Sequence, residues 1–393
     1  MGFASGAVSF RRFLVTGKSP KSVTEALLEK LSENALRPSE LGMPEDVEYG
    51  WSGGRHVLDG VFSFENNVYA DALHFGLRID TNKVPGDLKK AYLMMEEEAA
   101  AAGNPSGFIS KDQKRDARET VRRKVEEEMR SGKFRRSKLM PILWDLSGRM
   151  VYSPASGTVF EKLSELFERT FGLTLTPLTS GSLAHRLLEP RGRRRDYEDL
   201  RPTRFAAGPG GAGEHPEYPW VAKGPEPKDF LGNEFLVWLW HEADARTSIV
   251  ATEDSGDVTV FIDKSLDLDC AYGQSGSDSL RAQGPSRMPE ARAALRSGKV
   301  PRRAGLILDV ARQQYTLSLK AETMAVGTAK LPEVEADTPR VLFEERVALL
   351  RELAKITDGL FDVFLKVRAS SAWEGHANTI RRWITTTKNV AAA

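Results

Sequence analysis

A stretch crowded with proline, glycine and arginine interrupts this chain of 393 residues near its middle. It runs from residue 190 to residue 228 and contains RGRRRDYED and GPGGAGEHPEYP. Proline removes a backbone donor and fixes φ, whereas glycine raises the entropic cost of ordering the backbone. We therefore expect no regular element here, only a linker or an exposed loop. Its arginines would act either as a flexible phosphate contact or as a solubilising surface.

The region before this stretch alternates between strand and helix patterns. Apolar residues at helical spacing indicate helices, and short β-branched or aromatic runs between turn residues indicate strands. The expected elements are a strand at 7–17, a helix at 19–36, two or three strands at 56–80 parted by DG and ENN turns, a helix at 84–104, two strands joined by a turn at 138–154, a helix at 157–173 and a strand at 173–178.

The region after it is patterned again. A regular element is expected at 229–244, and a hairpin with a DSGD turn at 249–272. A short helix and strands are expected at 288–332, and a long amphipathic helix at 342–370. This mixture without strict βαβ alternation favours the α+β class, with mixed or antiparallel sheets, packed helices and a projecting basic helical segment. The expected domains are an N-terminal α+β region at 1–188 that includes the basic segment 86–138, a linker at 189–233, a β-rich insertion at 234–287, and C-terminal strands with a long helix at 288–393 that complete the core.

Positive charge is concentrated in one segment, although the whole chain carries a net charge of only +1. Between residues 111 and 138 there are twelve Lys or Arg residues against six acids. Helical spacing places cations on one stripe and apolar residues on an adjoining stripe that can pack on the body. The cationic stripe comprises Lys111, Arg115, Arg118 and Arg122, and the apolar stripe comprises Ala117, Val121, Val125 and Met129.

This segment has two interpretations. It suits contact with phosphates, but a charge run is also typical of a solvated helix face, for which Asp112, Asp116 and Glu119 supply ion-pair partners. The following GKFRRSKLM continues the cations without nearby acids and tips the balance towards a polyanionic partner.

Other features constrain the cellular setting. A single cysteine, Cys270, excludes an intramolecular disulfide and a cysteine-based metal cluster, and fits a reducing cytosol. The N-terminus lacks the pattern of a signal peptide, and no segment approaches the roughly 20 apolar residues of a membrane span. We expect a soluble, cytoplasmic protein with no membrane partner.

Residues suited to catalysis are sparse. The six histidines show no metal-binding spacing, and GPGGAG lacks the GK[ST] of a phosphate loop. Asp263, Asp267 and Asp269 could hold Mg²⁺ for phosphodiester cleavage, although such acids more often lie on the wet side of a hairpin. Cys270 fits a small buried residue, and the aromatic residues of NEFLVWLW fit core packing rather than a base-stacking platform. We expect no cofactor, and a binding protein is favoured over an enzyme.

The order of these segments resembles the family of the bacterial recombination-associated protein RdgC. The stretches that carry the resemblance are SFRRFLVTG, EYGWSGG, DTNKVPGDLKKAY, SKDQKRDARETVRRKV, RSKLMPILWDLSGRMVY, GTVFEKLSELFERTFGLTLTPL, EARAALRSGKVPRRAGLILD and LLRELAKITDGLFDVFLKV. Together they cover roughly residues 7–188 and 289–367. Shorter family members have little between the TPL and SGKV strands, whereas this chain inserts roughly residues 189–287.

The resemblance implies a ring-shaped homodimer that encircles double-stranded DNA without strong sequence preference and limits loading of the RecA recombinase. It implies a location at the nucleoid and no catalytic activity. The cations that it assigns to DNA contact are Lys111, Lys114, Arg115, Arg118, Arg122, Arg123, Arg135, Arg136, Lys138, Lys299, Arg302 and Arg303. Binding of single strands, the direction of the effect on recombination, ring closure and the role of the insertion stay open.

Two other classes of function also stay open. The chain could be a Mg²⁺-dependent nuclease that uses Asp263, Asp267 and Asp269. It could instead be a protein-interaction module, in which the basic helix docks an acidic partner and the tryptophan-rich insertion makes a second contact.

Overall fold

The computed structural model describes residues 2–37, 46–105, 107–208, 211, 214–224, 226–273 and 276–386. Its first half contains β1 (Val8–Thr16), α1 (Glu25–Glu33), β2 (Val47–Ser52), α2 (Phe64–Asn67), β3 (Val68–Tyr69), β4 (Ala72–Asn82), α3 (Gly86–Ala102), α4 (Lys111–Arg130), β5 (Arg135–Asp145), β6 (Met150–Ser153), α5 (Thr158–Phe171) and β7 (Thr174–Pro177). Its second half contains α6 (Ser180–Leu188), the 3₁₀ helix η1 (Glu189–Arg191), α7 (Arg194–Asp199), α8 (Phe230–Ala245), β8 (Ile249–Thr252), β9 (Gly256–Cys270), β10 (Ser277–Ala282), the 3₁₀ helix η2 (Pro285–Arg287), α9 (Pro289–Arg296), β11 (Lys299–Val310), β12 (Gln313–Lys320), β13 (Ala325–Lys330), α10 (Pro339–Arg368) and α11 (Trp373–Thr385).

The strands of the described chain form one 13-stranded sheet. Its path is β10-β9-β11-β12-β13-β1-β6-β5-β4-β2, with β8 added to β9, β7 to β1 and β3 to β4. The pairings between these strands are antiparallel. This large antiparallel sheet with eleven α-helices among the described residues confirms the α+β class.

Strand β1 joins the two halves of the sheet. Its first residues pair with β13, and its later residues pair with β6 and β7. Side chains alternate between the faces of a strand. Val8 and Phe10 accordingly enter one hydrophobic core, whereas Phe13 and Val15 enter the other. One strand thus contributes to two cores.

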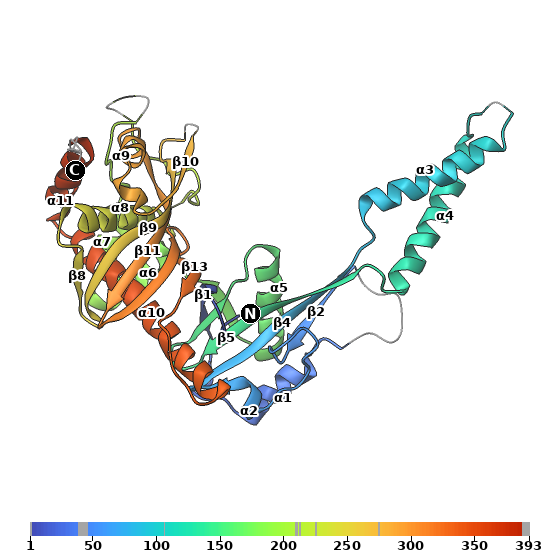
Figure 1. Ribbon diagram of the computed structural model, residues 1–393, viewed down its shortest axis with the longest axis horizontal. Coiled ribbons are helices and arrows are strands. Elements are labelled where there is room, and N and C mark those ends of the chain that lie inside the picture. Colours follow the sequence, from blue (N-terminus) through green and yellow to red (C-terminus); the bar gives the residue numbers. More distant parts are fainter. Residues whose placement is uncertain are drawn as a thin grey trace.

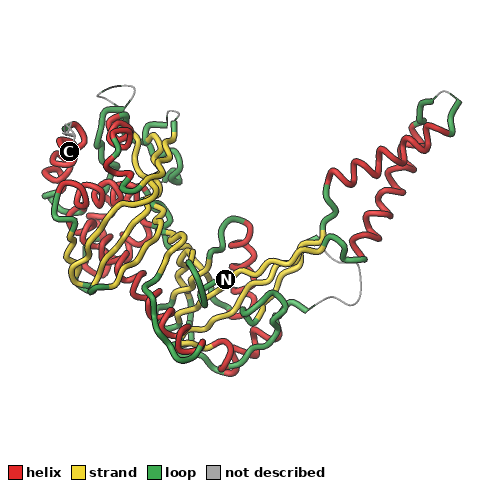
Figure 2. Tube along the Cα trace, viewed as in Figure 1, coloured by secondary structure: helices red, strands yellow, loops and turns green. Residues whose placement is uncertain are grey.

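The molecule has two lobes and one projection (Figures 1 and 2). The N-terminal lobe is built on β1–β7 with α1, α2 and α5, and the C-terminal lobe on β8–β13 with α6–α9 and α11. We call α3, α4 and the outer ends of β4 and β5 the arm, because they extend away from the N-terminal lobe. The long helix α10 runs from the N-terminal lobe into the C-terminal lobe.

The expected interruption is more ordered than its composition suggests. The expectation that 190–228 holds no regular element is wrong at its start, where η1 ends and α7 lies. The prolines and glycines lie outside α7, and Tyr197 anchors it because the ring is buried against His185. Residues 209, 210, 212 and 213 of GPGGAG lie outside the described residues.

The expected β-rich insertion at 234–287 is continuous with the C-terminal strands. It begins within α8, which packs against β11, and its longest strand, β9, pairs along β11. Burial of Phe235, Trp238 and Trp240 in α8 confirms core packing for these aromatic rings. Cys270 is buried, as expected.

Most other expected elements are present. The structure confirms the strands at β1, β5, β6 and β7, the β8–β9 hairpin and the helices α1, α3, α5 and α10. The ENN segment was expected as a turn but forms the single-turn helix α2, because the Ser63 hydroxyl accepts a hydrogen bond from the Asn66 amide. Helix α11 was not expected. No helix among the described residues is both long and apolar enough to cross a membrane.

Candidate nucleic-acid interface

The arm is carried by an extension of the sheet. Strands β4 and β5 pair over their full lengths, from Ala72 opposite Asp145 to Asn82 opposite Arg135. At the far end, the Asn82 side-chain amide donates a 2.7 Å hydrogen bond to the Met129 carbonyl of α4. This bond fixes the end of α4 to the strand from which the arm begins.

Local sequence determines where α4 starts. The Ser110 hydroxyl accepts a hydrogen bond from the Gln113 amide, and the Gln113 side chain accepts one from the Ser110 amide. This reciprocal capping satisfies two amides that the first turn of a helix leaves without partners. Asn104 also exchanges hydrogen bonds with the Gln113 side chain, so the loop between the helices is tied to the start of α4.

The apolar stripe of α4 faces α3. Ala117 and Val121 are buried, and α4 packs along α3 (Figure 1). The Tyr92 hydroxyl of α3 donates a 2.6 Å hydrogen bond to Glu128, and the Lys124 ammonium lies 4.2 Å from the centre of the Tyr92 ring. The expectation that this stripe packs on the body is therefore wrong, because the neighbouring antiparallel helix covers it.

The cationic stripe of α4 is open to solvent. Lys111, Arg115, Arg118 and Arg122 are all exposed. Arg115 reaches Asp112 at 3.6 Å and Asp116 at 3.9 Å, and Arg122 reaches Glu126 at 3.0 Å. Exposed pairs of this kind contribute only about 0–1 kcal/mol, so they do not hold the cations away from a stronger anion.

Several other cations of the arm have no ion pair within the described part of the chain. Six exposed cations of α4 and β5 have neither an ion pair nor an aromatic contact among the described residues: Lys111, Lys114, Arg118, Arg123, Arg136 and Lys138. Arg136 and Lys138 are two residues apart on β5 and therefore lie on the same face of that strand. This surplus of charge can bind a polyanion without first breaking internal contacts.

Arg135 differs from its neighbours. It is partly buried and pairs with Asp80 at 2.8 Å and Glu48 at 3.2 Å. Burial raises the pKa of Asp80, but hydrogen bonds from Arg78, Ser137 and Arg135 outweigh burial and hold that pKa below its ordinary value. Arg135 therefore stabilises the base of the arm.

The three cations of β11 lie in the C-terminal lobe, away from the arm (Figure 1). Lys299 pairs with Asp278 at 2.7 Å. Arg302 pairs with Glu322 at 2.7 Å and Asp269 at 3.0 Å, and lies over the Trp220 ring. Arg303 is exposed. A single chain does not bring these residues next to α4.

The three aspartates considered for Mg²⁺ binding lie on β9. Asp263 accepts a hydrogen bond from the Gly284 amide, Asp267 pairs with Arg281 at 2.7 Å, and Asp269 pairs with Arg302. No cluster of three or more potential metal ligands occurs among the residues that the structure describes. Each of the three carboxylates already has a hydrogen-bond or ion-pair partner within the fold.

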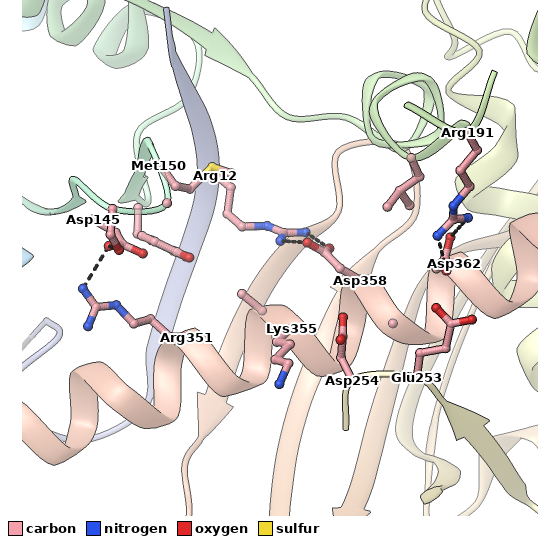
Figure 3. Close-up of a pocket in the computed structure, with 16 residues that line it drawn as sticks. Arg12, Asp145, Met150, Arg191, Glu253, Asp254, Arg351, Lys355, Asp358 and Asp362 are labelled. Carbon is pink, nitrogen blue, oxygen red and sulfur yellow. Dashed lines mark hydrogen bonds and ion pairs between the residues drawn. The ribbon is translucent and has the colours of Figure 1, made fainter. Parts of the chain in front are cut away.

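A charged cavity of about 500 Å³ lies where α10 crosses from one lobe to the other (Figure 3). Three ion pairs to α10 line it, and we call them the interlobe joint: Arg12–Asp358 at 2.6 Å, Asp145–Arg351 at 2.9 Å and Arg191–Asp362 at 2.6 Å. The sequence analysis did not identify these residues, although the arginine pair within the first strand was a visible signal.

Arg12 is the most deeply buried member of the joint. Its side chain is 3% exposed, and both terminal nitrogens donate hydrogen bonds to Asp358, at 2.6 and 2.7 Å. Burial lowers the pKa of Arg12, but the charge and hydrogen bonds of Asp358 outweigh it and raise that pKa above its ordinary value. Arg12 is therefore a structural cation that fastens β1 to α10.

A comparison of the sequence with protein-family models finds no match, and a comparison with curated proteins finds no relative.

Proposed function

We propose that this protein binds double-stranded DNA through the arm, largely without regard to base sequence and without catalysing a reaction. The observation that carries the proposal is the exposed row of Lys and Arg on α4 and β5, in which six cations have neither an ion pair nor an aromatic contact among the described residues. Lys and Arg that contact phosphates release condensed counterions, and this gain does not depend on which bases are present.

The shape of the arm supports this proposal. The arm projects from the N-terminal lobe, so a long polyanion can approach α4 without displacing the rest of the chain (Figure 2). Burial of the apolar stripe against α3 leaves the cationic stripe at the surface. A rigid helix pair also presents the cations with less loss of entropy than a flexible loop would.

The measurement is a salt series with the intact protein and two fluorescent duplexes of unrelated sequence. If six to ten cations engage, log affinity falls against log salt with a slope between about −5 and −9 for both duplexes. A flat response, or a strong preference for one duplex, contradicts the proposal.

The RdgC resemblance extends the proposal to a ring-shaped homodimer that encircles DNA, limits access of RecA and lies at the nucleoid in the cytoplasm. A topological assay tests the ring: after transfer to high salt, a closed ring stays on circular duplex but slides from the ends of linear duplex. Equal release from circles and lines contradicts encirclement, while the salt series still tests DNA binding by itself.

A second candidate function is docking of an acidic protein. Met94 and Met95 of α3 and Phe108 in the loop between α3 and α4 are exposed, and such apolar groups favour a protein surface over a phosphate backbone. Retention on immobilised duplex DNA at moderate salt supports DNA binding, whereas failure of retention together with binding to an acidic protein surface supports this alternative.

A further inference from the structure

A second concentration of positive charge lies at the opposite end of the molecule from the arm. There, a hollow of about 650 Å³ opens between the end of α8 and helix α11. Both helices belong to the C-terminal lobe (Figure 1). Its polar lining comes from His241, Arg246, His376, Thr379, Arg382 and Thr386, and Trp383 supplies an aromatic wall. Among the described residues that line it there is no carboxylate.

The cations of this hollow are weakly compensated. Arg246 reaches Glu242 at 3.5 Å, but its side chain is 54% exposed. Arg382 is exposed and has no ion pair within the described chain; its guanidinium makes two long contacts of 3.5 Å, to the Asn378 carbonyl and to the Thr379 hydroxyl. Two guanidinium groups that share one hollow without full neutralisation repel each other, so an anion between them is favoured.

The wall formed by Trp383 and His241 is the independent sign of a ligand. His241 is only 5% exposed, and its ring lies edge-on to the Trp383 ring at 5.4 Å. The Nδ1 atom of His241 lies 3.2 Å from a Glu242 oxygen, which fixes the orientation of the ring. The indole Nε1 of Trp383 is buried and has no hydrogen-bond partner among the described residues. A buried polar atom without a partner is costly, and a ligand in the hollow would supply one.

The chemistry of the lining indicates the class of ligand. Guanidinium groups match phosphate oxygens with paired hydrogen bonds, and imidazole and hydroxyl groups complete such a shell. The volume lies within the range of about 300–1,000 Å³ that is typical of small-molecule pockets. We propose that this hollow binds the phosphate group of a small phosphorylated ligand of nucleotide size, independently of DNA binding by the arm.

The experiment is calorimetric titration of the intact protein with adenosine monophosphate, adenosine and inorganic phosphate. Adenosine monophosphate is expected to bind, inorganic phosphate to bind more weakly, and adenosine to give no measurable heat. Because each lost charged hydrogen bond is worth a tenfold or larger factor, the double variant Arg246→Gln/Arg382→Gln should weaken adenosine monophosphate binding by at least about tenfold.

A matched control is Arg169→Gln, which removes an exposed arginine of α5 that has no ion pair within the described chain. It should bind adenosine monophosphate like the parent protein, and all variants should share its melting temperature. Equal affinity of the double variant and the parent, or absence of binding to both phosphate probes, overturns the proposal.

Duplex DNA is the other source of phosphate in this system. The double variant should keep the DNA affinity of the parent protein. If it loses DNA affinity and neither phosphate probe binds the parent, the hollow is a DNA contact and the small-ligand proposal is wrong. If adenosine monophosphate binds while duplex DNA does not, the hollow is supported and the proposed function of the arm fails.

Discussion

Arginine has opposite roles in the arm and in the interlobe joint. Arg118 on α4 is exposed and has no ion pair in the described chain, whereas Arg12 on β1 is 3% exposed and makes two hydrogen bonds to Asp358. In the joint, loss of the Asp358 carboxylate would leave the Arg12 cation buried in a protein interior that solvates charge poorly. In the arm, water solvates the cation, so its charge stays available to a partner. Burial, rather than residue type, separates the two roles.

The largest expected effect is on the stability of the joint. Asp358→Asn removes the counter-charge of the buried Arg12 and should lower the free energy of unfolding by about 3–5 kcal/mol. Urea denaturation measures the loss. The matched control is Asp112→Asn, which breaks the exposed pair with Arg115 on α4 and should change stability by less than about 1 kcal/mol. Equal losses in the two variants would remove the distinction between arm and joint.

A double variant sharpens this result. Arg12→Leu combined with Asp358→Asn removes the buried charge itself, so it should recover part of the stability that Asp358→Asn loses. The losses in free energy of unfolding of the single variants Arg12→Leu and Asp358→Asn give an additive expectation. If the double variant loses more than that sum, the ion pair is not the source of the loss in Asp358→Asn.

The next largest expected effect is on the pH dependence of stability. It involves His74, which is buried near Phe343 of α10. Burial, partly opposed by the charge of Asp59, lowers the pKa of His74 to about 4 in the folded protein. An unfolded chain has a histidine pKa of about 6.5, so it binds more protons than the folded state between these values. The free energy of unfolding should therefore fall as pH drops from about 6.5 to 4, by about 3 kcal/mol for this residue.

Urea denaturation across this pH range tests the His74 prediction. His74→Leu should remove this part of the acid sensitivity, whereas His56→Leu, at an exposed position, should leave it unchanged. The same pH dependence in His74→Leu and the parent protein would contradict the assignment.

The smallest expected effect is that of Arg118→Gln. Because the side chain is exposed and has no ion pair in the described chain, stability should change by no more than about 0.5 kcal/mol. The slope of log DNA affinity against log salt should become shallower by about 0.9, which corresponds to one phosphate contact. An unchanged slope would show that Arg118 does not contact phosphate.

Much of the fold was predictable from local pattern. The apolar spacing of α5 and α10 and the turn between β8 and β9 depend on neighbouring residues, and these elements lie where the pattern indicates. Distant pairing was not predictable. Residues 234–287 were expected as a β-rich insertion, but β9 pairs with β11 of the C-terminal strands, and no local pattern determines which strands become neighbours.

The candidate site shows the same division. The stripe on α4 follows from helical spacing alone, and the structure confirms that the segment is a helix with this stripe exposed. The sequence could not reveal that Arg135, Lys299 and Arg302 are held by ion pairs, because Asp80, Asp278 and Glu322 reach them only through tertiary structure. Arg12 and Asp358 are 346 positions apart, so their pairing carries no sequence signal.

The most direct test of the central claim compares two triple variants in one DNA-binding assay. Arg115→Glu/Arg118→Glu/Arg122→Glu reverses the cationic stripe of α4. Arg169→Glu/Arg186→Glu/Arg287→Glu makes the same change in net charge at exposed positions of other elements. We predict that the α4 variant loses at least about a hundredfold in duplex affinity at about 0.1 M salt, while the second stays within about threefold of the parent. Normal binding by the α4 variant, or equal losses in both, would contradict the claim that the placement of charge on the arm binds DNA.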